Sequence, residues 1–252
     1  MQTQDQHDQL DQLLRQGRGG SWWPFLLAAA LLVGVAGYGI SIYDSLPDRI
    51  PLHFGADGQA TRWGRKSPGT VFMPLIVTAA TTWMIPLVAL LLPSFVTTPK
   101  DASAWTRLRV EGSIRGTRAG LGWVSVLVAL LMAWISVASW RAPEWLSPWP
   151  VALFIVAMFT ALVLAYRRWA RWARSTAQLH GIHPTPEEEA EERLWLPLGL
   201  YKNPEDPRVM VPKREGHGLG TTINVGSRGG RIAVVAFAVA IIVPIVLIAW
   251  LG

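Results

Sequence analysis

Five long stretches without a charged side chain constrain the fold of this 252-residue chain more than any other feature. A helix needs about 20 residues to cross the hydrocarbon core of a bilayer, and each stretch has at least 21. A buried helix of a soluble protein rarely runs so far without charge, so we expect five membrane-spanning helices. The stretches are Trp22–Tyr43, Gly69–Thr98, Ala119–Trp140, Trp145–Tyr166 and Ile232–Gly252.

The predicted fold is therefore an all-α integral membrane protein, with five transmembrane helices and a small cytoplasmic segment that contains a β-hairpin. Apolar residues make up 51% of the chain, which fits this class. The first apolar stretch is longer than the roughly 7–15 residues of a signal peptide, so we expect it to be retained. The expected parts are a tail (1–21), two helices with an outer loop at 44–68 (22–98), a cytoplasmic loop and two helices (99–166), a cytoplasmic segment (167–231) and a last helix (232–252).

The distribution of lysine and arginine predicts the orientation, because cytoplasmic loops carry an excess of both. With the N-terminus inside, the inner segments hold 18 of these residues and the outer segments hold 5. We therefore expect a cytoplasmic N-terminus and an extracytoplasmic C-terminus, although Arg62, Arg65 and Lys66 of the outer loop run against the trend. The net charge of +6 is then explained by attraction to membrane lipids, and nucleic-acid binding is not expected.

The residues of the membrane spans argue against several classes of membrane protein function. The spans lack ionisable side chains, which argues against a proton-coupled transporter, an intramembrane aspartyl protease and a helix-borne zinc site. The absence of cysteine excludes disulfides and thiolate metal sites. We expect a non-enzymatic protein without catalytic residues, metal or cofactor.

The outer loop, 44–68, carries signals of a defined shape. Pro47 and Pro51 favour extended geometry in the residues before them, and Asp57-Gly58 is a turn signal. His53 lies at the centre of the loop. Five apolar side chains are expected to pack on the helix ends: Leu46, Ile50, Leu52, Phe54 and Trp63.

The simplest interpretation of His53 is an imidazole that ties the loop to a carbonyl or a carboxylate. With Asp48 and Asp57, His53 would provide one imidazole and two carboxylates, which are few ligands for a divalent-metal site and few groups for acid-base catalysis. A lipid-modifying or metal-dependent enzyme that uses these three residues stays open as a third class of function.

A cytoplasmic helix is expected to continue from the fourth span, because Arg167, Arg171 and Arg174 then share one face. Thr185 and Glu188 fit a capping box, which predicts a short acidic helix after it. The glutamates of this helix would form a solvated face: Glu187, Glu188, Glu189, Glu191 and Glu192.

Two β-prone runs, Arg208–Val211 and Thr221–Val225, predict a small hairpin in the cytoplasmic segment. The turn between them also suggests a phosphate cradle, but its spacing matches neither the P-loop nor the dinucleotide-binding pattern, so a glycine-rich turn is the simpler interpretation. The cradle would use Lys213, Arg214, Gly216, Gly218 and Gly220.

The outer loop sequence LPDRIPLHFGADGQATRWGRKSP resembles the LP-x-x-IP-x-H signature of a family of bacterial membrane proteins of unknown function. That family includes the immunity protein of a sporulation-delaying toxin system. The likeness runs from about Trp22 to Ile76, and Gly55 stands where family members often carry Asn. It rests on Leu46, Pro47, Ile50, Pro51, His53, Gly58 and Trp63.

The cytoplasmic segment is similar to a second, short, uncharacterised bacterial domain with the run Y-x-NP-x-DPR-x-x-VP-x-R-x-G-x-G. The matching residues are Tyr201, Asn203, Pro204, Asp206, Pro207, Arg208, Val211, Pro212, Arg214, Gly216 and Gly218. Together the two resemblances imply a multi-pass protein of the bacterial cytoplasmic (inner) membrane, and neither implies a reaction.

We therefore expect a membrane protein that senses, or confers immunity to, an extracellular peptide or envelope stress, with a membrane or cytoplasmic protein as a further partner. The alternative is an accessory subunit of a larger membrane complex or exporter. The candidate residues in the outer loop are Pro47, Asp48, Pro51, His53, Asp57, Gly58 and Trp63. Those of the cytoplasmic motif are Tyr201, Asn203, Asp206, Arg208, Arg214, Gly216 and Gly218.

Overall fold

The computed structural model describes residues 10–16, 19, 22–55, 57–96, 98, 101–141, 144–214 and 220–251, with the backbone alone at 198, 241, 242 and 244–251. Gly216 and Gly218 of the expected motif lie outside the described residues. The chain is mostly helical and forms two compact units, and four long helices, at 68–91, 104–140, 149–179 and 228–251, contribute to both. The first unit comprises Met1–Trp22, Val88–Gly120 and Leu162–Ala238, and the second comprises Trp23–Leu87, Leu121–Ala161 and Val239–Gly252.

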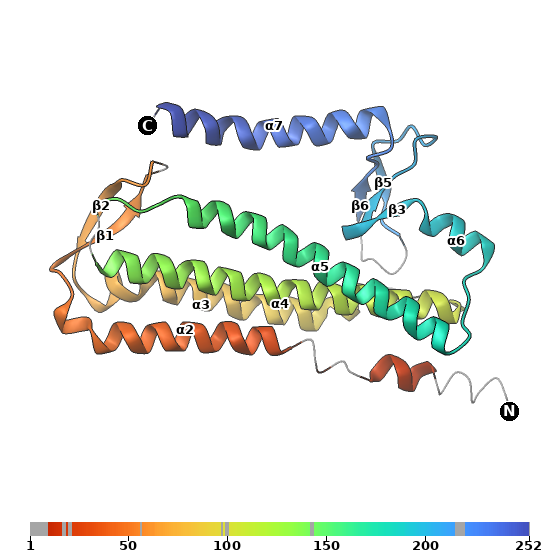
Figure 1. The fold of residues 1–252 in the computed structure, drawn as a ribbon, viewed down its shortest axis with the longest axis horizontal. Helices are drawn as coiled ribbons and strands as arrows, with labels where there is room; N and C mark the ends of the chain where they lie inside the picture. Colours follow the sequence, from red (N-terminus) through yellow and green to blue (C-terminus); the bar gives the residue numbers. More distant parts are fainter. Residues whose placement is uncertain are drawn as a thin grey trace. The chain divides into compact units, whose positions relative to one another are not determined.

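Four helices among the described residues are long and apolar enough to cross a membrane, which indicates a membrane protein. They are α2 (Trp23–Ser41), α3 (Pro68–Leu91), α4 (Ala104–Trp140) and α5 (Trp149–Leu179), drawn in Figure 1. The first four expected stretches are thus confirmed as long apolar helices. The fifth forms helix α7 (Arg228–Leu251), and its crossing of a membrane stays a prediction.

Two of these helices extend well beyond their apolar stretches. Helix α4 begins at Ala104, so most of the segment before the apolar stretch at 119–140 is helical. The reason is a local start signal, since the Ser103 hydroxyl accepts a 3.0 Å hydrogen bond from the Thr106 N–H and so caps the helix. Helix α5 continues to Leu179, which confirms the predicted extension past Tyr166.

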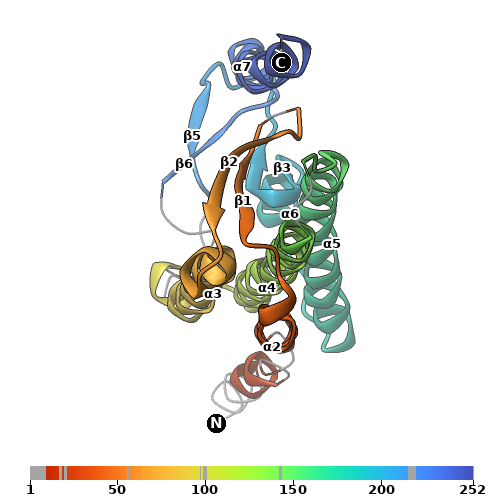
Figure 2. The same ribbon diagram turned by 90° about the vertical axis from the view of Figure 1, so that its left-hand side faces the viewer.

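The second unit carries an antiparallel hairpin of β1 (Arg49–Phe54) and β2 (Ala60–Arg65), preceded by the short 3-10 helix η2 (Tyr43–Ser45). Figure 2 looks nearly along α2 and α3, with the hairpin at their near end. The hydrophobic core of this unit contains Ile50 of the hairpin and Leu46, which precedes it, together with residues of α2, α3 and α4. Its buried members are Ala28, Leu32, Leu46, Ile50, Val71, Leu75, Val126, Ala129 and Trp140.

The first unit has a small β-rich region between α5 and α7. Helix α6 (Pro186–Glu192) starts with the predicted capping box at Thr185. The predicted hairpin is confirmed with shifted bounds, as β5 (Met210–Pro212) paired with β6 (Thr221–Ile223). A further pair, β3 (Trp195–Leu196) and β4 (Leu200–Tyr201), frames the 3-10 helix η4 (Pro197–Gly199). Earlier in the chain, the 3-10 helix η3 (Leu92–Phe95) directly follows α3.

Small residues bring α4 and α5 close together within the first unit. Gly112, Gly116 and Gly120 recur every four residues on α4 and face α5. A Cβ on Gly112 would lie 3.0 Å from the Trp169 carbonyl oxygen and 3.1 Å from the Ala173 Cβ. This Gly-x-x-x-Gly spacing is typical of closely packed membrane helices. The packing fixes the position of the α5 arginines against α4.

Arg115 of α4 joins part of the expected N-terminal tail to this helix. Arg115 is only 2% exposed, and its Nε lies 2.8 Å from Glu111 Oε1. Its Nη2 donates hydrogen bonds to the carbonyl oxygens of Leu14 and Gln16, and its guanidinium lies 4.1 Å from the Trp172 ring centre. Residues 10–16 therefore pack onto the helices of the first unit.

Candidate functional site

The base of the β1–β2 hairpin is fastened to the ends of its neighbouring helices. Leu46 and Ile50 are buried in the core of the second unit, as the sequence predicts. The ammonium group of Lys66 donates hydrogen bonds to the carbonyl oxygens of Leu46 at 2.9 Å and Asp44 at 3.2 Å. The Lys66 N–H donates to the Asp48 carbonyl oxygen at 2.7 Å. Lys66 thus closes the base of the hairpin.

The tip of the hairpin is held by the segment that precedes α5. The Leu146 N–H donates a 2.7 Å hydrogen bond to the Gly58 carbonyl oxygen, and the Ala60 N–H donates one of the same length to the Glu144 carbonyl oxygen. Gly58 has a φ of +84°, which confirms the predicted glycine turn. The indole N–H of Trp145 donates a 2.8 Å hydrogen bond to the carbonyl oxygen of Asp57 in the turn. These contacts include an isolated antiparallel bridge between Gln59 and Trp145 at the tip.

The three residues of the possible metal or acid-base set are not gathered by the fold. His53 Nδ1 lies 2.7 Å from the Thr61 hydroxyl across the hairpin, so its partner is a hydroxyl and not the predicted carbonyl or carboxylate. The Asp57 carboxylate accepts the Gln59 N–H within the turn. No group of three or more metal-ligating side chains exists among the residues that the structure describes. The side-chain contacts of His53 and Asp57 are thus both with residues of the hairpin.

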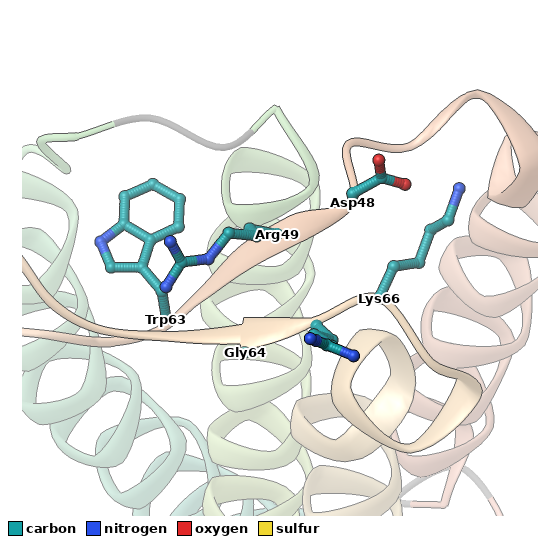
Figure 3. A pocket seen from close by; sticks show the side chains of 6 residues that line it. Asp48, Arg49, Trp63, Gly64 and Lys66 are labelled. Carbon is teal, nitrogen blue, oxygen red and sulfur yellow. The ribbon is translucent and has the colours of Figure 1, made fainter.

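One face of the hairpin displays cations beside an indole. In the strand register Arg49 pairs with Arg65, and the next pair on this face is Pro51 with Trp63. Arg49 and Arg65 are exposed, Trp63 is half-buried, and Pro51 is buried. Arg49, Trp63 and Arg65 border a pocket of about 620 Å³, shown in Figure 3, whose lining is Asp48, Arg49, Trp63, Gly64, Arg65 and Lys66. Three cations and one carboxylate give this pocket a positive balance.

The opposite face of the hairpin borders a larger crevice of about 1070 Å³. Helices α3, α4 and α5 supply mostly apolar walls, with Val77, Met132 and Ile155 among them. His53 and Arg62 are the ionisable side chains that line it. Its chemistry suits a hydrocarbon chain, as expected at the end of a helix bundle in lipid.

The motif that begins at Tyr201 is organised by a residue that the sequence analysis did not single out. Asn224 is fully buried. Its amide donates to the carbonyl oxygens of Asn203 at 2.9 Å and Asp206 at 2.8 Å. Its oxygen accepts the N–H groups of Asn203 and Gly226, each at 3.0 Å. All four hydrogen-bonding positions of this amide are used, so Asn224 fixes the course of the motif loop.

The polar residues of the motif mostly hold its own backbone. The Asn203 amide donates to the Tyr201 hydroxyl at 3.1 Å. Asp206 accepts the Arg208 N–H and forms a two-point ion pair with its guanidinium. The Arg208 side chain, and then its backbone N–H, hold the pKa of the Asp206 carboxyl below its ordinary range. Arg208 remains largely exposed, whereas Arg214 is buried.

The acidic helix α6 is only in part the solvated face that the sequence predicts, because Glu187, Glu189 and Glu191 are exposed whereas Glu188 and Glu192 are half-buried. Glu188 Oε1 accepts hydrogen bonds from the hydroxyls of Ser103 at 2.5 Å and Thr106 at 2.8 Å. Partial burial alone would raise the pKa of the Glu188 carboxyl, but the hydrogen bonds from Ser103, the Thr185 backbone and Thr106 lower it. Three further glutamates form ion pairs, namely Glu189 with the nearby Arg193, Glu191 with Arg214 and Glu192 with Arg174. The partners of Glu188, Glu191 and Glu192 lie far away in sequence, so the local pattern did not indicate them.

One family matches the chain in comparisons with known proteins. It is described as a domain of unknown function (DUF1648), and the match covers residues 30–78. This region comprises most of α2, the whole β1–β2 hairpin and the beginning of α3. It supports an uncharacterised domain centred on the hairpin. No curated protein and no solved structure matches the chain.

Proposed function

We propose that this chain is a multi-pass membrane protein whose β1–β2 hairpin binds an extracytoplasmic peptide, and so senses that peptide or confers immunity to it. The observation that carries the proposal is the cationic and aromatic face of Arg49, Trp63 and Arg65 on a hairpin fastened at base and tip. A surface held in one shape before binding loses little conformational entropy when a partner docks. The hairpin is thus better suited to recognition than a free linker.

The chemistry of this face favours an extended peptide with carboxylate groups and an apolar side chain. Arginine guanidinium groups pair with carboxylates through two parallel hydrogen bonds, and an indole offers a rigid apolar surface. Among the described residues, β2 is joined to segments other than β1 at Ala60, by the Glu144 carbonyl, and at Arg65, whose carbonyl oxygen accepts the Thr70 hydroxyl, so the edge from Thr61 to Gly64 is open. An extended peptide can add to such an edge as a further strand.

The membrane setting of the proposal rests on charge and resemblance. The lysine and arginine distribution favours a cytoplasmic N-terminus, which puts the hairpin outside and the cytoplasmic motif inside. The domain match at 30–78 covers the hairpin, and the LP-x-x-IP-x-H signature resembles a family with an immunity protein in the bacterial inner membrane. The exposed Arg208 of the cytoplasmic motif then offers a contact for a cytoplasmic protein partner.

Selection from a displayed library of random peptides, with the full chain held in lipid nanodiscs, tests the proposal. The hairpin variant combines Arg49→Gln with Arg65→Gln, and the matched control is Arg62→Gln on the other face of the same strand. We expect peptides rich in Asp and Glu to be enriched over empty nanodiscs, and to be lost from the hairpin variant but kept by the control.

Two results would count against peptide binding. One is a library that shows no enrichment over empty nanodiscs, and the other is enrichment that both variants retain equally. In cells, deletion of residues 46–66 should abolish tolerance to any selected peptide that inhibits growth. Unchanged tolerance in that deletion strain would remove the immunity part of the proposal.

The second candidate function is an accessory subunit of a larger membrane complex. Helix α5 favours it, because its apolar stretch is the least buried of the four apolar helices within the described chain. A partner helix could cover it as well as lipid does. Purification in mild detergent separates the two functions: a stoichiometric protein partner supports the subunit, and a chain that purifies alone supports the peptide receptor.

A further inference from the structure

A pocket of about 560 Å³ lies wholly within the first unit, away from the hairpin. Helix α4 forms one wall and the arginine-bearing half of α5 forms another. The end of α6 and the segment after it complete the lining. The side chains that matter for its chemistry are Trp105, Arg109, Tyr166, Arg167, Arg171, Arg174, Glu192, Trp195 and Arg214.

The pocket has a strong excess of positive charge. Five arginines line it, and Glu192 is the one carboxylate among the described lining residues. Arg174 pairs with Glu192 at 2.8 Å, and Arg214 pairs at 3.1 Å with Glu191. The carboxylate of Glu188 also interacts with Arg109, so five arginines against three carboxylates leave an excess of two positive charges. Like charges held this close repel one another, so an anion in the pocket would relieve the repulsion.

A second, independent feature also points to a ligand that accepts hydrogen bonds. Trp105 lines the pocket and is only 7% exposed. Its indole N–H has no acceptor among the residues that the structure describes. A buried donor without an acceptor is costly, and native proteins pair most such groups. An anionic ligand with several oxygens would satisfy it.

We propose that this pocket binds a phosphate group, carried by a lipid headgroup or by a free phosphate compound. Planar guanidinium groups match the geometry of phosphate oxygens, and aromatic walls give the site a defined shape. Arg167 directly follows Tyr166, which ends the charge-free stretch of α5. The arginines therefore begin where lipid headgroups are expected. This site is independent of the peptide proposal, since it shares no residue with the hairpin.

Native mass spectrometry of the full chain in mild detergent tests the site with two probes, phosphatidylglycerol and inorganic pyrophosphate. The pocket variant combines Arg167→Gln with Arg171→Gln, whose side chains are exposed and so are not needed for folding. The matched control removes two exposed arginines outside the pocket lining, Arg168→Gln and Arg193→Gln. We expect the dissociation constant to rise about tenfold or more in the pocket variant and less than about threefold in the control.

The two probes distinguish the two sources of the phosphate group. If phosphatidylglycerol shows this pattern, the ligand is a lipid headgroup, and if pyrophosphate alone shows it, the ligand is a free phosphate compound. The proposal is overturned if neither probe binds the wild-type chain, or if both variants weaken binding equally.

Trp105→Phe gives a finer test, because it removes the indole N–H and keeps an aromatic ring. We expect it to weaken binding of the responding probe about tenfold, as for loss of a hydrogen bond to a charged group. Unchanged binding in a folded Trp105→Phe protein would exclude the indole from the site and leave the arginine cluster without its second support. That result would also overturn the proposal as stated.

Discussion

The carbonyl oxygen of Gly58 accepts a 2.7 Å hydrogen bond from the backbone N–H of Leu146. An antiparallel bridge between Gln59 and Trp145 lies beside it. These bonds connect the tip of the hairpin to the segment before α5, which is separated from it in the sequence by helices α3 and α4. Because a two-stranded hairpin alone is marginally stable, this connection and the buried base account for a hairpin of fixed shape.

Gly58→Ala should destabilise the protein by more than about 2 kcal/mol, because the new Cβ would meet the Leu146 carbonyl oxygen and the φ of +84° disfavours any side chain. Thermal unfolding in detergent measures the effect. Gly181→Ala is the control, since it has a φ of +64° but open space around it, and should cost about 1 kcal/mol. Equal effects of the two substitutions would show that the tip contact is not formed.

Ile50→Ala should lower the free energy of unfolding by about 2–5 kcal/mol, as expected when a fully buried aliphatic side chain is truncated. Ile50 is 2% exposed in the core of the second unit. Leu52→Ala on the same strand should cost less, because Leu52 is 38% exposed. Urea or thermal unfolding of both variants checks this, and a larger loss for Leu52→Ala would mean that the hairpin packs through its other face.

Glu188→Gln should destabilise the protein at pH 7, and this difference from wild type should shrink as the pH falls. The pKa of Glu188 is lowered in the folded protein, so its stabilising contribution is complete above the ordinary value of 4.5 and is lost as the pH falls through the lowered value. Thermal midpoints between pH 7 and pH 3 measure it. Glu189→Gln, with an exposed carboxylate, is the control, and a Glu188 effect that persists unchanged at pH 3 would contradict the assignment.

Asn224→Ala should cost about 3 kcal/mol or more, because it leaves two carbonyl oxygens and two N–H groups of the motif loop without their shared partner. Asn224→Asp should be at least as damaging, since it replaces the amide donors with an acceptor. Limited proteolysis between residues 203 and 226 reports the loosening. A protease-resistant Asn224→Ala protein would show that the motif is held by other contacts.

Local signals account for the parts of the fold that the sequence predicts. Apolar stretches of sufficient length form helices α2 to α5, and the capping box at Thr185 starts α6. The glycine at position 58 takes the expected positive φ, and Leu46 and Ile50 reach the core. Each of these features depends on residues within a few positions of one another.

The remaining features depend on partners far apart in sequence or on a pattern that was overlooked. The strands β1 and β2 were not predicted, because Pro47 and Pro51 read as loop signals and the stabilising segment lies before α5. Glu188 is fixed by Ser103, which no local pattern reveals. The Gly-x-x-x-Gly spacing that begins at Gly112 was visible in the sequence and indicates the α4–α5 packing.

The central claim is that the β1–β2 hairpin faces the cell exterior while the arginine-rich first unit faces the cytoplasm. The chain has no cysteine, so single cysteines report topology without background. Arg62→Cys and Glu189→Cys would be labelled with a membrane-impermeant maleimide in intact bacterial cells and again after permeabilisation. The account predicts labelling of Arg62→Cys in intact cells and of Glu189→Cys only after permeabilisation. The reverse pattern, or labelling of both in intact cells, would contradict it.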